Sequence, residues 1–117
     1  MANILLVDDD PDVLVTLCAI LEEAGHIVQP AATNVAAHDI IGRGGLHLIV
    51  ADAVLRGGNG DDLASSASDL GVPILLISGE PARLERLRRG RIRFLAKPFR
   101  ADALITAVSD LLAGRRI

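Results

Sequence analysis

The chain has 117 residues, of which 50% are hydrophobic and 23% are charged, and its formal net charge is −3. This length suits a single domain, and the high apolar content with a small net charge excludes an intrinsically disordered protein. The only cysteine, Cys18, excludes a disulfide framework and a cysteine-based zinc site. No apolar run approaches the roughly 20 residues needed to span a bilayer. The first residues also lack the basic and apolar regions of a secretory signal, so we expect a cytoplasmic protein without membrane contact.

Charge is unevenly distributed along the chain. Residues 1–79 carry 2 arginines and 11 acidic residues, a balance of −9, whereas residues 80–117 carry 10 basic and 4 acidic residues, a balance of +6. Lysine occurs only at position 97. The chain lacks Trp and Tyr for base stacking and is acidic overall, so we interpret its arginine-rich run as a solvated helix face or a protein-contact surface, not a nucleic-acid site. The run consists of Arg83, Arg86, Arg88, Arg89, Arg91 and Arg93.

The first two predicted elements are a buried strand and an amphipathic helix. Residues 4–7 form a continuous apolar run that stops at acidic residues, which is typical of a strand buried on both faces. Asp10 and Pro11 then provide an N-cap and a first helical residue. Apolar residues follow at helical spacing until Gly25, where we expect the helix to end.

The middle of the chain repeats this alternation. We predict a weaker strand over residues 26–30, a short helix over 33–41 and a third strand over 46–51, which leads directly into Asp52. Residues 55–60 contain three glycines and an asparagine, and this composition predicts a loop.

From residue 61 onward, the sequence predicts two further strands and three helices. The helices are expected over residues 61–70, 81–89 and 100–113, and the strands over 72–77 and 92–96. Five apolar strands that alternate with five helices predict a parallel sheet with helices on both faces.

Polar residues follow the predicted strands at the point where each strand ends. Asp8 and Asp9 follow the first strand, Asp52 the third, Ser78 the fourth and Lys97 the fifth. The carboxyl ends of parallel strands meet at one edge of the sheet, so we expect these side chains to converge. Three close carboxylates repel one another unless a hard cation lies among them, and Mg²⁺ takes such oxygen ligands. A carboxylate in that setting can attack phosphorus while a hydroxyl and an ammonium hold the phosphoryl oxygens.

At these positions the sequence resembles the response regulator receiver domains of two-component signalling. The matching motifs are Val-Asp-Asp-Asp-Pro at 7–11, the strand-ending Asp52, Ile-Ser-Gly at 77–79 and Ala-Lys-Pro-Phe at 96–99. They occur in order, each at the end of an apolar strand, and the resemblance covers the whole chain. It implies one receiver domain over residues 1–117, with the doubly wound, CheY-like parallel sheet of strand order 2-1-3-4-5.

The resemblance also implies a phosphorylation site. Asp52 would accept a phosphoryl group from a histidine kinase or a histidine phosphotransfer protein. Asp9, Asp52 and the main-chain carbonyl of Val54 would bind Mg²⁺ directly, and Asp8 would act through a water bound to the metal.

Further roles follow from the same resemblance. Ser78 and Lys97 would each bind an oxygen of the phosphoryl group, and the peptide bond that follows Lys97 is often cis in the family. Phe94 matches the aromatic residue that turns inward when Ser78 moves. Val54 and Glu80 occupy positions that tune the lifetime of the phosphorylated state.

The expected function is therefore that of a phosphoacceptor module, monomeric or weakly dimeric, which changes its protein contacts on phosphorylation and is not a turnover enzyme. A pseudo-receiver that acts by constitutive protein contact is the first alternative, and loss of Mg²⁺ binding would favour it. A small hydrolase would need a further acid or base and a substrate pocket, and a flavin binder would need a less acidic first loop. Three histidines, His26, His38 and His47, lack metal-ligand spacing and are interpreted as structural.

Overall fold

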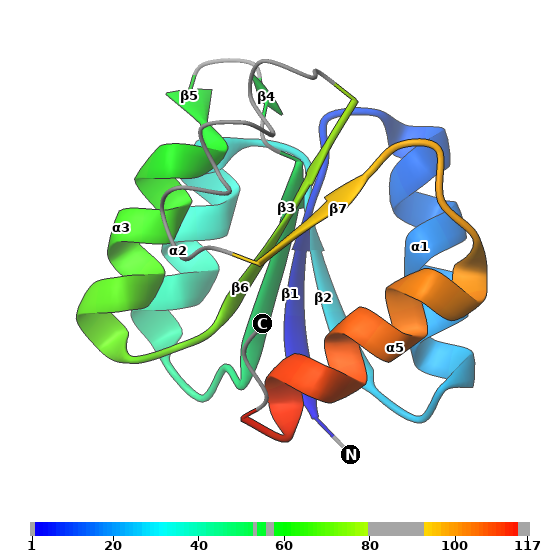
Figure 1. Ribbon diagram of the computed structural model, residues 1–117. Helices are drawn as coiled ribbons and strands as arrows, with labels where there is room; N and C mark the ends of the chain where they lie inside the picture. The colour runs from blue at the N-terminus through cyan, green and yellow to red at the C-terminus, as the bar shows by residue number, and fades with distance from the viewer. Residues whose placement is uncertain (1, 53, 56–57, 80–92, 115–117) are drawn as a thin grey trace.

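The computed structural model describes residues 2–52, 54–55, 58–79 and 93–114. A five-stranded, all-parallel sheet lies at its centre, with the order β2-β1-β3-β6-β7 (Figure 1). Counted along the chain, the strands of this sheet run 2-1-3-4-5, so the predicted topology is confirmed. The strands are β1 (Asn3–Val7), β2 (Ile27–Ala31), β3 (Leu48–Asp52), β6 (Ile74–Ser78) and β7 (Arg93–Ala96).

Helices cover both faces of the sheet. The helices α1 (Pro11–Glu23) and α5 (Ala101–Leu112) lie on one face, while α2 (Asn34–Arg43) and α3 (Gly60–Leu70) lie on the other (Figure 1). The helix predicted over residues 81–89 falls outside the described residues. Within the described ranges, no helix combines the length and the hydropathy needed to cross a membrane.

Strand geometry explains why the sheet has two cores. Successive side chains of a strand point to opposite faces. Ile4 and Leu6 therefore pack in the core under α1 and α5, whereas Leu5 and Val7 pack in the core under α2 and α3. Because both faces are covered, the strands are continuous apolar runs and not alternating ones, as the sequence predicts.

The first helix begins and ends at the expected residues. The carboxylate of Asp10 accepts hydrogen bonds from the backbone N–H groups of Asp12 (3.0 Å) and Val13 (3.4 Å), and Pro11 is the first helical residue. Gly25 follows the helix with φ = 97°, a left-handed conformation that a side chain would strain.

Several boundaries differ from the predicted ones. The second and third strands begin one and two residues later than expected, so His26 and His47 lie just before β2 and β3. The fourth strand extends through Ser78. The predicted loop contains a short antiparallel pair, β4 (Val54–Leu55) with β5 (Gly58–Asn59), because tertiary placement allowed a ladder that composition does not indicate.

Shortening one buried side chain of a strand tests how much the core under α2 and α3 contributes to stability. Leu76 in β6 is fully buried, whereas Val15 on α1 is 71% exposed. We expect Leu76→Ala to lower the free energy of unfolding by about 2–5 kcal/mol, through lost burial and a residual cavity. Val15→Ala is the control and should stay within about 0.5 kcal/mol of the native chain in urea titrations. Equal effects of the two changes would contradict this description of the core.

Candidate functional site

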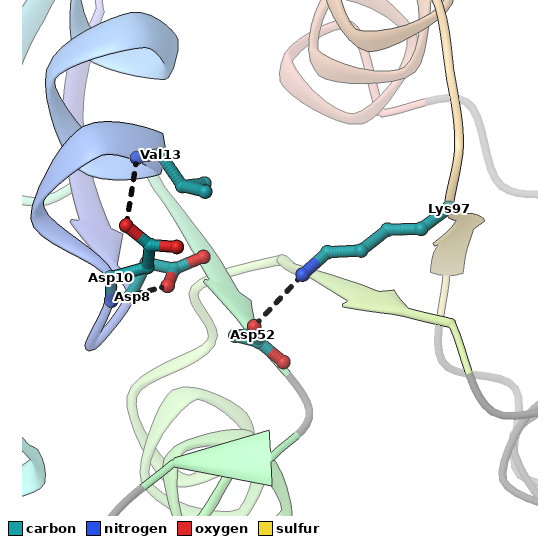
Figure 2. A network of polar contacts seen from close by, with 5 residues as sticks. All are labelled: Asp8, Asp10, Val13, Asp52 and Lys97. Atoms are coloured by element: carbon teal, nitrogen blue, oxygen red, sulfur yellow. Dashed lines mark hydrogen bonds and ion pairs between the residues drawn. The ribbon is translucent and has the colours of Figure 1, made fainter.

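Strand register brings the predicted polar residues to one edge of the sheet. Val7 pairs with Ala51, Asp52 with Ile77, and Ser78 with Ala96 in the ladders between adjacent strands. The residues that end these strands therefore lie side by side, and Figure 2 shows Asp8, Asp52 and Lys97 around one region at this edge.

Asp8 is the most buried acidic group of the edge, with 2% of its surface exposed. Its backbone N–H donates to the carbonyl of Ala31 (3.1 Å), which extends the ladder between β1 and β2 by one residue. Its Oδ1 accepts a hydrogen bond from the backbone N–H of Asp10 (2.9 Å, Figure 2). Its Oδ2 is buried and has no hydrogen-bond partner. A buried oxygen without a partner is costly, so this atom is suited to an added donor or cation.

Burial raises the pKa of the Asp8 carboxyl above its ordinary value, because the charged form is desolvated. The hydrogen bond from Asp10 opposes this shift in pKa, and so does the positive charge of Lys97. The negative charges of Asp52 and Asp9 reinforce it. Desolvation is thus the main reason why this carboxylate is harder to ionise than an exposed one.

An ion pair joins the ends of the third and fifth strands of the sheet. The Nζ of Lys97 lies 3.1 Å from Oδ2 of Asp52 and donates a hydrogen bond to it (Figure 2). The Asp52 side chain is 13% exposed and that of Lys97 is 38% exposed. The ammonium therefore belongs to the more exposed partner of the pair and the carboxylate to the more buried one.

Ser78 lies at the end of β6 and is buried. Its carbonyl accepts a hydrogen bond from the backbone N–H of Lys97 (2.9 Å). The Lys97–Pro98 peptide bond is cis, as expected. These contacts tie the backbone of the lysine to the end of the strand that carries the serine.

The other predicted residues have more varied positions. Asp9 follows Asp8 and is partly exposed. Val54 belongs to β4 and pairs with Asn59. Phe94 lies in β7 opposite Leu76 and is partly buried against the core under α2 and α3. Glu80 lies outside the described residues. The roles of all four stay predictions.

The donor set fits a magnesium ion better than a transition metal. Across the described residues no three His, Cys, Asp or Glu side chains form a ligand group for a metal ion. Mg²⁺ needs only one or two carboxylates, with water and phosphoryl oxygens completing its octahedron. The unpartnered Oδ2 of Asp8 supplies a further acceptor for a water bound to such an ion.

The sequence did not indicate one hydrogen bond that holds a residue of the site. Asp10 was interpreted only as a helix cap, but its backbone N–H also holds the Asp8 carboxylate. The available signal was the spacing of two residues between the acids, which allows an Asx-type turn. The ion pair between Lys97 and Asp52 was also not expected, because Lys97 was assigned to a phosphoryl oxygen.

Comparison with known proteins places this site in a familiar context. The sequence model of one protein family, the response regulator receiver domain, matches residues 4–109 of this chain. PgtA of Salmonella typhimurium, a phosphoglycerate transport system transcriptional regulatory protein, is 32% identical over 97% of this chain, but only 29% of its own length is covered. PilH of Pseudomonas aeruginosa is 27% identical over 97% of this chain and 100% of its own length. The chain thus corresponds to less than a third of one relative and to the whole of another.

A solved structure shares the fold. The response regulator protein TrrA of Thermotoga maritima, in complex with Mg²⁺-BeF, superimposes with a TM-score of 0.85 at 24% identity, covering 95% of this chain and 99% of that one. At this identity the likeness shows the fold alone.

Neutralising the buried acid tests the electrostatics of the edge. In metal-free buffer near neutral pH, we expect Asp8→Asn to raise the free energy of unfolding by about 1–3 kcal/mol, because it removes a buried charge with an unpartnered oxygen. The amide oxygen can still accept from the N–H of Asp10. Added Mg²⁺ should stabilise the native chain more than the variant in the same urea titration.

Asp39→Asn is the matched control for Asp8→Asn. Asp39 is an exposed acid on α2 that pairs with Arg43 at 2.7 Å. Its change should shift the free energy of unfolding by less than about 0.5 kcal/mol and leave the Mg²⁺ response intact. A native chain that is more stable than Asp8→Asn without metal would show that the buried carboxylate is already compensated.

Proposed function

The chain belongs to the response regulator receiver domain family, and we propose that it accepts a phosphoryl group on Asp52 in a Mg²⁺-dependent reaction and then binds its protein partners differently. The observation that carries this proposal is the pairing of the Asp52 carboxylate with Lys97 beside the buried, under-compensated Asp8.

The proposed reaction is an in-line transfer from a phosphohistidine. A carboxylate oxygen of Asp52 attacks the phosphorus, the P–N bond breaks, and the donor imidazole leaves after a proton from solvent neutralises it. The product is an aspartyl phosphate. This step needs no general acid or base from the chain. That agrees with a module that is phosphorylated once and does not turn over an external substrate.

Positive charge is what this chain adds to the transfer. Lys97 already contacts one oxygen of Asp52 at 3.1 Å, so a small movement of its Nζ reaches an oxygen of the added group. Ser78 lies on the neighbouring strand, where its hydroxyl can bind a second oxygen. Asp9, Asp52 and the carbonyl of Val54 would hold Mg²⁺, with Asp8 acting through water. The ion, when bound, offsets the negative charge of the transferred group.

The proposed switch depends on new bonds to the phosphoryl group. A ligand shifts a conformational equilibrium only by its different affinity for the two states. Movement of Ser78 and Lys97 toward the group would release space beside β7, where Phe94 is only partly buried. Val54 and Glu80 are proposed to tune the lifetime of the phosphorylated state, since both lie close in sequence to a site residue.

The proposed donor is a histidine kinase or a histidine phosphotransfer protein, in the cytoplasm. A groove of about 660 Å³ lies between α1 and the segment after β7, directly beside Lys97. We propose that the helix bearing the phosphohistidine occupies it, because a donor must dock next to Asp52 and the groove is mostly apolar. Its lining includes Val13, Thr16, Leu17 and Ile20 of α1, together with Pro98 and Phe99.

Phosphorylation by a small donor tests the site. With Mg²⁺ and a small acyl phosphate, the intact mass of the native chain should rise by one phosphoryl group. Asp52→Asn should gain no mass, because its amide lacks a nucleophilic carboxylate. Asp39→Asn, which keeps every residue of the site, should be labelled like the native chain.

The other outcomes identify the alternatives. Labelling of Asp52→Asn to the native level would contradict the assignment of the phosphoacceptor. A native chain that neither gains mass nor binds Mg²⁺ would indicate a pseudo-receiver that acts by constitutive contact. Sustained turnover of a small phosphoester would indicate a hydrolase.

Two neighbouring residues of α1 test the docking groove. Thr16 lines it, whereas Val15 is exposed outside it. We expect Thr16→Arg to slow transfer from a phosphorylated histidine phosphotransfer protein by about tenfold or more, as expected for a charged obstruction at an interface centre. Labelling of the same variant by a small acyl phosphate should be unchanged. Val15→Arg should leave both rates unchanged, and equal slowing by the two variants would place the donor elsewhere.

A further inference from the structure

Two histidine side chains hold the first residues of the central strand, at the end of the sheet opposite the carboxylates. The Nδ1 of His47 accepts a hydrogen bond from the backbone N–H of Asn3 at 2.9 Å. The Nδ1 of His26 accepts from the backbone N–H of Ala2 at 3.4 Å. Neither contact was specifically expected, although the sequence analysis interprets both histidines as structural and not as metal ligands.

The two rings take the place of missing strand carbonyls. β1 lies between β2 and β3, and both neighbours begin just after a histidine. On each side a backbone hydrogen bond also runs in the opposite direction, from the neighbouring segment to Ala2 or Asn3. The N–H of Ile27 donates to the carbonyl of Ala2 (2.8 Å), and the N–H of His47 donates to the carbonyl of Asn3 (2.9 Å). Each ring therefore closes a ladder that would otherwise leave an N–H of β1 unpaired.

These contacts require neutral imidazoles. A ring nitrogen that accepts a hydrogen bond carries a lone pair, so the proton of each neutral ring is on Nε2. In an imidazolium both nitrogens are donors, and Nδ1 would then face another N–H. Protonation thus converts each contact from attraction to repulsion.

We propose that His26 and His47 form a proton-sensitive latch on the N-terminal end of β1, closed when both rings are neutral and opened by their protonation. The name histidine latch is used below for these two residues with the N–H groups of Ala2 and Asn3.

The surroundings of the His26 ring disfavour a positive charge. A cavity of about 460 Å³ is lined by both rings and by apolar residues of α5 and of the segment before β6, including Pro73, Leu111 and Leu112. Burial, together with the positive charge of the chain's amino terminus, lowers the pKa of His26 below its ordinary value.

Other charged groups near the latch do not offset this. Within the described residues, no carboxylate forms an ion pair with either ring. The C-terminal end of α5 lies at the cavity and favours a cation, which opposes the effect of desolvation on His26. The charged residues of the surrounding elements are Asp12, Glu22 and Glu23 on α1, Asp102 on α5 paired with Arg100 at 3.4 Å, Asp110 on α5 paired with Arg93 of β7 at 4.0 Å, and Asp39 on α2 paired with Arg43.

The direction of the pH dependence follows from these facts. His26 has a lower pKa in the folded chain than the ordinary 6.5. Its contribution to stability is complete above that ordinary value and is lost as the pH falls through the lower folded pKa. The contact between His26 and the Ala2 N–H should accordingly be closed at neutral pH and open in mild acid, while the strand interior remains paired.

Amide exchange followed by NMR tests the latch. For the native chain, the protection factor of the Ala2 amide, which His26 holds, should fall below about pH 6.5, by up to about tenfold per pH unit for the proton taken up. The Ala51 amide in the middle of β3 should keep its protection over the same range. A parallel loss at both amides would mean global unfolding and would overturn the proposal.

Asparagine variants provide the matched comparison. Asparagine places an oxygen acceptor where histidine places Nδ1, and it does not titrate. The double variant with His26→Asn and His47→Asn should therefore protect Ala2 equally at pH 7.5 and pH 5.5, as expected for a group that binds no proton. His38→Asn, which changes an exposed histidine on α2, should behave like the native chain. Loss of the pH dependence in His38→Asn would overturn the proposal.

The native chain alone provides a second test that no folding defect can obscure. Long-range ¹H–¹⁵N correlation of the imidazoles should show the Nε2–H form of both His26 and His47 at neutral pH. The Nδ1–H form at either ring would overturn the latch. All of these measurements apply equally to Asp52→Asn, so failure of the latch is distinguishable from failure of the proposed phosphorylation.

Discussion

The rest of the site depends on one constraint, the burial of a carboxylate among other carboxylates at the end of an apolar strand. Asp8 is almost fully buried, and one of its oxygens has no partner. Desolvation and the charges of Asp9 and Asp52 oppose its ionisation, while a single backbone N–H and the ammonium of Lys97 favour it. Isolated carboxylates do not tolerate such burial in proteins. The edge therefore favours added positive charge, which Lys97 supplies in part.

A rigid scaffold is what allows that constraint to persist. Two apolar cores, one on each face, cover every strand of the sheet, so the strand ends cannot relax away from one another. Register then determines which side chains meet: Asp52 ends β3 beside the strand that ends in Ser78, and Lys97 reaches back across that strand to Asp52.

Backbone groups at the two ends of β1 find their hydrogen-bond partners in different ways. A central strand that extends beyond its neighbours leaves backbone groups without ladder partners. At the carboxyl end, the Asp8 N–H reaches the carbonyl of Ala31, and the Asp8 side chain in turn accepts from Asp10. At the amino end, imidazole nitrogens of His26 and His47 replace the missing carbonyls. The hydrogen bonds at the carboxyl end of β1 therefore also involve a charged residue of the site, and those at the amino end also involve titratable imidazoles.

The sequence by itself determined the five strands of the central sheet, the four described helices, the Asp10 cap and the set of polar residues at the strand ends, because burial and periodicity are local properties of the chain. It indicated a parallel sheet, while the strand order came from the family resemblance. Only the tertiary structure decided which residues are partners. It paired Lys97 with Asp52, left an oxygen of Asp8 without a partner, and placed two histidines against Ala2 and Asn3. It also revealed the β4–β5 pair. These contacts join residues that are separated by up to 45 positions. They depend on strand register and on distances between elements, which local preferences do not encode.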